Sequence, residues 1–192
     1  MGVEINETNA HGISTRATVT SDTSTVASLA SDLALLLLGM WFGAAVFFSV
    51  VVAPNVFTVL RSFLLVNANE IAGTIVTRTL SVINLGGFVI GLLLLATVLV
   101  FRRTARPVFF IIEFVSLALM TITTALGHWF IAAKMLALRG AMVIPIDHVA
   151  RDNPRRVAFD RLHGYSVAAL GVAVIAALVA FILIARHSRA KA

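Results

Sequence analysis

Four long apolar blocks constrain this chain more than any other feature of its sequence. Each is long enough to cross a bilayer core, which takes about 20 residues in an α-helix. Hydrophobic residues make up 59% of the chain and charged residues 12%, whereas soluble domains average about 45–50% and about 25%. The sequence therefore predicts an all-α integral membrane protein, a bundle of four transmembrane helices over residues 33–185. The predicted spans are 33–60, 79–101, 108–137 and 162–185.

The two ends of the chain differ from this apolar domain. Residues 1–32 are polar and rich in serine and threonine, which predicts a mobile, disordered tail, and residues 186–192 form a basic tail. We expect the tail not to be a signal peptide, because the apolar run after it is too long. Four crossings put both termini on one side of the membrane, here called the termini side. The opposite, distal side holds the predicted connections 61–78 and 138–161, and the basic residues divide almost equally between the sides.

Composition and motifs exclude several classes of function. The net charge of +6 comes mostly from Lys and Arg beside the apolar blocks, where they anchor helix ends at anionic lipid headgroups rather than bind nucleic acid. The chain has no cysteine, so disulfides, zinc–thiolate sites and iron–sulfur clusters are excluded. Phosphate loops, dinucleotide fingerprints and hydrolase motifs are also missing from the sequence. We therefore expect no enzymatic activity.

Small residues recur at helical spacing within the spans. Membrane helices associate largely through close packing of such residues. We interpret these positions as packing within the bundle, and a dimer face is the alternative. The positions are Gly39, Gly43, Gly86, Gly87, Gly91, Ala169, Ala173 and Ala177.

Polar residues inside the spans are the candidates for function, because their burial in lipid is costly. The helix order places four of them, Asn55, Asn84, His128 and His163, toward the distal side. This clustering predicts a polar vestibule in the distal half of the bundle. A histidine pair there could bind copper, haem or a pigment as a cofactor.

The two histidines also have structural interpretations. His128 precedes Trp129, which is typical of the membrane interface, and His163 could cap the start of the fourth helix.

Two further positions stand out in the spans. Pro54 removes one backbone hydrogen bond, and we expect it to kink the first helix. Glu113 lies toward the termini side. It can pair with the arginines of 102–106, or it can act in a proton or cation relay.

Several short motifs carry a resemblance to a known family. They are Trp41-x-Gly43, Ala53-Pro54-x-x-Phe57, Ala72-Gly73, Asn153-Pro154-Arg155-Arg156 and Phe159-x-x-Leu162-His163-x-x-Ser166. The order and spacing of these motifs resemble those of the bacterial domain-of-unknown-function family 4149. This family is similar to eukaryotic transmembrane protein 205. The chain resembles copper-resistance membrane domains more distantly. The resemblance implies a four-span bundle of a bacterial inner membrane without an established activity, and it adds weight to Pro54 and His163.

These observations lead to one functional expectation and two alternatives. We expect a non-enzymatic accessory or scaffold subunit of a larger membrane assembly, whose partners are the lipid bilayer and other membrane subunits or further copies of itself. The first alternative is ligand or ion handling by His128 and His163 in the distal vestibule. The second is a small oligomeric transporter with Glu113 as the proton-coupling group.

Overall fold

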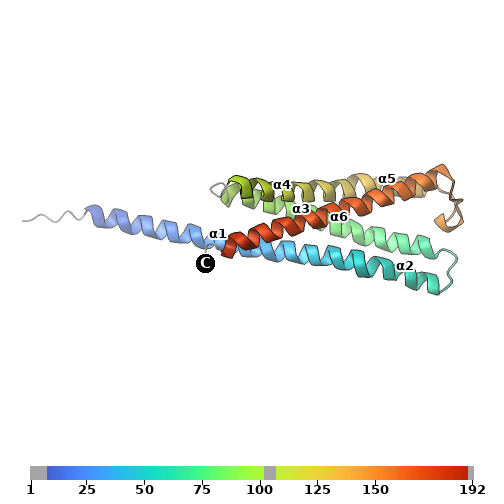
Figure 1. The fold of residues 1–192 in the computed structure, drawn as a ribbon, viewed down its shortest axis with the longest axis horizontal. Helices are drawn as coiled ribbons and strands as arrows, with labels where there is room; N and C mark the ends of the chain where they lie inside the picture. The colour runs from blue at the N-terminus through green and yellow to red at the C-terminus, as the bar shows by residue number, and fades with distance from the viewer. Residues whose placement is uncertain (1–7, 102–106, 190–192) are drawn as a thin grey trace, which may run out of the picture.

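The computed structural model describes the backbone of residues 8–101 and 107–189, and side chains at 26 and over 28–100 and 107–186. The described residues are mostly helical and contain no strand. Four helical segments are long and apolar enough to span a membrane, and the all-α prediction is confirmed (Figure 1). These segments are Ser28–Ser62, Ala68–Val100, Pro107–Gly140 and Pro154–Arg186.

Two of the four segments contain a π-helical turn. The elements in chain order are α1 (Thr8–Phe47), η1 (Phe48–Val52), α2 (Ala53–Ser62), α3 (Ala68–Phe101), α4 (Pro107–Ala125), η2 (Leu126–Ile131), α5 (Ala132–Gly140), η3 (Ile146–His148) and α6 (Pro154–Arg189). Both η1 and η2 are π-helical, and η3 is a short 3₁₀ helix on the distal side.

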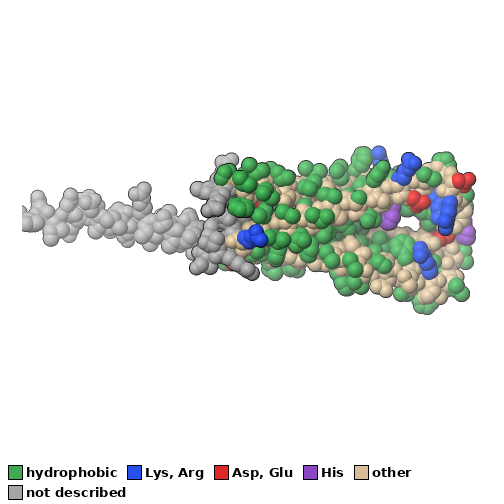
Figure 2. Space-filling model, in the orientation of Figure 1, with side chains coloured by type: hydrophobic (Ala, Val, Ile, Leu, Met, Phe, Trp, Pro, Cys, Tyr) green, Lys and Arg blue, Asp and Glu red, His purple; other side chains and the backbone are tan. Residues whose placement is uncertain are grey.

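The four segments close into a ring around one core. Helix α1 packs against α3 and α6, and α4 packs against the same two helices. The core contains fully buried Leu38, Leu117 and Met120, with Ala173 and Ala177 from α6. Toward the distal end, α2 packs on α3 and α5 packs on α6. The two pairs diverge there (Figure 1) and leave a narrow opening between them (Figure 2).

The outer surface of the bundle is apolar. Large side chains such as Val82, Val100, Val115 and Ile175 are more than half exposed. Figure 2 shows this apolar surface along the helices, with charged side chains gathered toward the distal end. Long apolar helices with an apolar exterior belong in a lipid bilayer, so this is a multi-pass membrane protein.

The first helix begins earlier than expected. A disordered tail was predicted over 1–32, but the structure is helical from Thr8, and residues 1–7 lie outside the described part. Helix nucleation is the costly step, and each added residue of an existing helix gains a hydrogen bond. The apolar span therefore allows the helix to extend into the polar sequence, where α1 projects beyond the bundle (Figure 1).

Two later helices also begin before their apolar blocks. Helix α3 starts at Ala68 rather than near 79, and α6 at Pro154 rather than near 162. Most of the predicted connection 61–78 is thus the first part of α3. Hydropathy marks the part of a helix that lies in hydrocarbon, whereas its polar first turns extend into the headgroup region.

Pro54 produces a π-helical turn. The turn η1 directly precedes α2, and Pro54 is the second residue of α2. Proline has no N–H to donate, and its ring collides with the carbonyl four residues earlier. A wider turn relieves this collision and keeps the helix continuous.

Glycines allow α3 to approach its neighbours closely. A Cβ atom on Gly87 would lie 2.7 Å from the Trp41 indole and 2.8 Å from Cγ2 of Thr124. A Cβ on Gly91 would overlap the Thr121 hydroxyl. These glycines pack within the bundle, as the first interpretation of the small residues expected.

Candidate functional site

Near its middle, the interior of the bundle contains a layer of polar groups. We define this polar layer as Trp41, Ser81, Asn84, Gly127 and His128. His128 lies on η2 and is half-buried. Its Nδ1 lies 3.0 Å from Oγ of Ser81 and 3.1 Å from the Ser81 carbonyl oxygen. In either tautomer, this nitrogen therefore has a hydrogen-bond partner on α3.

Close packing completes the polar layer. A Cβ on Gly127 would lie 2.8 Å from Nδ2 of Asn84, so glycine at this position lets the buried Asn84 side chain lie against η2. The Trp41 indole N–H donates to the Ile83 carbonyl oxygen at 2.8 Å. Side chains of α1, α3 and η2 thus meet at one depth of the bundle.

The aromatic ring next to His128 faces outward. Trp129 is 52% exposed, and its ring contacts both His128 and Phe88 edge to face at centroid distances of 4.7 Å. The exposed ring places Trp129 on the lipid-facing surface, and the interfacial interpretation of the His128–Trp129 pair stays a prediction.

The other predicted distal residues lie on the surface of the bundle. His163, Pro54 and Asn55 are exposed, and the Asn55 amide donates to the Val51 carbonyl of its own helix at 2.7 Å. Of the distal candidates, only Asn84 and His128 lie inward. The described residues contain no group of three or more His, Asp or Glu side chains that could hold a metal ion.

Glu113 is buried in α4, toward the termini side. The arginines proposed as its partners, Arg102, Arg103 and Arg106, lie outside the described residues. Their pairing with Glu113 stays a prediction.

A cluster of charged and amide side chains at the distal end was not predicted from the sequence. We define this distal clasp as Asn69, Glu70, Arg139, Asp147 and Arg156. The Arg139 guanidinium is paired with the Glu70 carboxylate, and Arg139 Nε donates to Glu70 Oε1 at 2.9 Å. The Ile146 N–H donates to Glu70 Oε2 at 3.1 Å. Glu70 thereby binds both the end of α5 and the start of η3.

Asp147 makes the reciprocal contacts from η3. Its carboxylate accepts from the Glu70 backbone N–H at 3.2 Å and from the Asn69 side-chain amide. Free N–H groups in the first turn of a helix need acceptors, and here the acceptor comes from a distant loop. The two acidic residues therefore join the first turn of α3 to the connection between α5 and α6.

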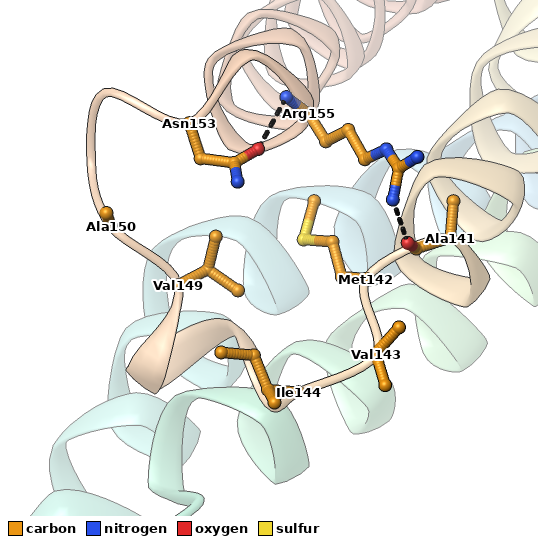
Figure 3. A pocket seen from close by; sticks show the side chains of 8 residues that line it. All are labelled: Ala141, Met142, Val143, Ile144, Val149, Ala150, Asn153 and Arg155. Carbon is orange, nitrogen blue, oxygen red and sulfur yellow. Dashed lines mark hydrogen bonds between the residues drawn. The ribbon is translucent and has the colours of Figure 1, made fainter.

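The motif Asn153-Pro154-Arg155-Arg156 has a structural role in this loop. Asn153 Oδ1 accepts from the Arg155 N–H at 3.0 Å, which makes Asn153 the N-cap of α6 with Pro154 as the first helical residue. Figure 3 shows the Arg155 guanidinium donating across a hollow of about 150 Å³ to the Ala141 carbonyl. Arg156 donates to the carbonyls of Ile146 at 2.8 Å and Val149 at 2.6 Å.

A second, larger hollow lies on the outside of the bundle between α5 and α6. This groove has a volume of about 600 Å³. It is lined by Lys134, Asp152, Pro154, Val157, Ala158, Arg161, Leu162 and Tyr165.

The comparison with known families agrees with the resemblance noted above. The profile described as "Domain of unknown function (DUF4149)" matches residues 36–143, more than half of the 192 residues. The chain belongs to the DUF4149 family. The DUF4149 match contains Pro54, Asn84, Glu113 and His128 and ends before His163.

The DUF4149 description assigns no activity. No curated protein and no solved structure matches the chain. The more distant likenesses to transmembrane protein 205 and to copper-resistance domains therefore stay predictions.

Proposed function

We propose that this chain is a non-enzymatic accessory or scaffold subunit of a larger membrane assembly. The observation that carries the proposal is the outward face of α6, where Gly164, Ala168 and Gly171 are exposed. A Cβ atom on either glycine would meet no atom within 4 Å. These three residues follow the i, i+4, i+7 spacing and so share one side of the helix.

A glycine inside a helix lowers the stability of that helix by about 1 kcal/mol relative to alanine. Among the described side chains, none lies close to Gly164 or Gly171, unlike the neighbours of Gly87 and Gly91 on α3. They are flanked by exposed Val167 and Val172, and a surface of small residues beside branched ones accepts a second membrane helix at short distance. The projection of α1 beyond the bundle (Figure 1) offers a further contact on the termini side.

The proposed location is the cytoplasmic, inner membrane of a bacterium. Its support is the helical architecture, since proteins of the bacterial outer membrane are β-barrels.

A larger side chain on the outward face of α6 should release the proposed partner subunit. Gly171→Leu is expected to reduce the mass of the particle isolated from native membranes in mild detergent to that of the single chain. The fold should be kept, because leucine favours helix more than glycine does. The matched control is Ala96→Leu, which adds bulk at an exposed position of α3 and should leave the particle mass unchanged. A wild-type protein isolated as a lone monomer would contradict the proposal.

Ligand handling at His128 is a second candidate. The observation in its favour is the π-helical turn that carries His128, because π-turns within α-helices occur frequently at functional sites. The purified protein should then hold a stoichiometric metal or chromophore, measured by metal analysis and absorption spectroscopy. The His128→Ala, His163→Ala double variant should lose it, and Asn55→Ala should retain it. A colourless, metal-free wild-type protein would refute this candidate.

A further inference from the structure

The groove between α5 and α6 combines two cations with an apolar floor. Lys134 of α5 and Arg161 of α6 line it together with Val157, Leu162 and Tyr165. The Lys134 ammonium lies 4.2 Å from the centroid of the Phe130 ring, which holds the charge at the helix surface by a cation–π contact. The groove therefore presents positive charge beside apolar side chains.

With each span centred in the bilayer, these cations lie near the edge of the hydrocarbon core. The segment Pro107–Gly140 has 34 residues, so it is about 51 Å long and exceeds the ~30 Å hydrocarbon core by about 10 Å at each end. Lys134 lies about 9 Å from the distal end of this segment, and Arg161 about 10 Å from the start of α6. Both cations therefore lie where hydrocarbon gives way to headgroups.

The cations that line this groove outnumber its acidic residues. Ion pairs among the described side chains join Glu70 with Arg139 and Asp160 with Arg156, and neither pair includes Lys134 or Arg161. Asp152 is the one acidic residue of the groove lining. The groove thus retains a net positive charge.

We propose that this groove binds the headgroup of an anionic phospholipid from the surrounding leaflet. Lys134 and Arg161 contact the phosphate oxygens, and an acyl chain follows Leu162 toward the bilayer centre. Basic pockets between membrane helices are suited to such headgroups, and the Tyr165 side chain, 63% exposed, has the amphipathic character of interfacial aromatic residues. Arg161 lies three residues before Gly164 on the same side of α6, so this lipid site adjoins the distal end of the partner surface proposed above.

Lipid retention by the intact protein tests the site. The full chain in mild detergent is titrated with phosphatidylglycerol, and bound lipid is counted by native mass spectrometry. Lys134→Gln and Arg161→Gln should each weaken binding about fivefold, and the double variant about 25-fold. Arg78→Gln is the matched control, since Arg78 is an exposed cation of α3 outside the groove, and it should bind as the wild type does.

Three results would overturn the proposal. The first is a double variant that binds phosphatidylglycerol as tightly as the wild type. The second is equal retention of the zwitterionic lipid phosphatidylcholine by the wild type, which needs no variant. The third is displacement of the lipid by millimolar inorganic phosphate, which would assign the site to a free anion.

Discussion

Gly87→Leu is expected to destabilise the bundle by about 3 kcal/mol or more, since new bulk at a closely packed position forces its neighbours to move. The neighbours here have little freedom. Trp41 is 5% exposed and its indole N–H is bound to the Ile83 carbonyl, and Thr124 is 1% exposed. A Cβ on Gly87 would lie within 2.8 Å of both side chains. The variant should therefore separate α1 and α4 from α3.

Thermal unfolding in detergent, followed by circular dichroism and size-exclusion chromatography, measures this effect. Gly43→Leu is the control, because a Cβ on Gly43 would meet no atom within 4 Å. The control should be as stable as the wild type or slightly more so, since leucine favours helix. Equal stability of Gly87→Leu and Gly43→Leu would show that α3 does not pack against Trp41 as described.

Glu70→Ala is the second substitution with a large expected effect. It removes the partner of Arg139 and the acceptor for the Ile146 N–H. The Glu70 and Arg139 side chains are 29% and 22% exposed, so breaking their pair should cost less than the 3–5 kcal/mol of a fully buried one. We expect about 2 kcal/mol. The connection 141–153 should then detach from α3 and become accessible to protease.

Limited proteolysis and the unfolding midpoint together check this prediction. Asp160→Ala is the matched control, because Asp160 is 62% exposed and lies 4.0 Å from Arg156. Such an exposed pair contributes little, so the control should shift stability by less than about 0.5 kcal/mol. The Arg139→Ala and Glu70→Ala effects should be non-additive in the double variant. Strict additivity would mean that the two residues act independently.

The candidate site shows how far spacing along a chain can place residues in space. The order of the spans grouped Asn84 with His128, and in the structure the Asn84 side chain lies against η2, the turn that carries His128. The span order could not determine which side of each helix faces inward. His163 and Asn55 lie on exposed sides of their helices, and Ser81, which binds His128, carried no signal in the sequence.

The distal clasp could not be predicted for a related reason. Glu70 and Asp147 are 77 residues apart, and each lies in a polar stretch that sequence alone assigns to solvent. They meet because the first turn of α3 and the α5–α6 connection lie at the same side of the bundle. The motif Asn153-Pro154 was noticed in the sequence, but its function as a helix cap became clear only from the Arg155 hydrogen bond.

The sequence by itself determined the membrane environment, the number of spans and the all-α class. Hydropathy suffices for these because lipid excludes unpaired backbone groups and so requires helices of a minimum length. The tertiary structure decided where α3 and α6 start and that a π-turn forms at Pro54. It also decided which glycines pack inside the bundle and which are exposed. Gly87 and Gly171 look alike in sequence, yet one lies against Trp41 and the other faces outward. That difference depends on the rotation of each helix, which contacts with its neighbours fix.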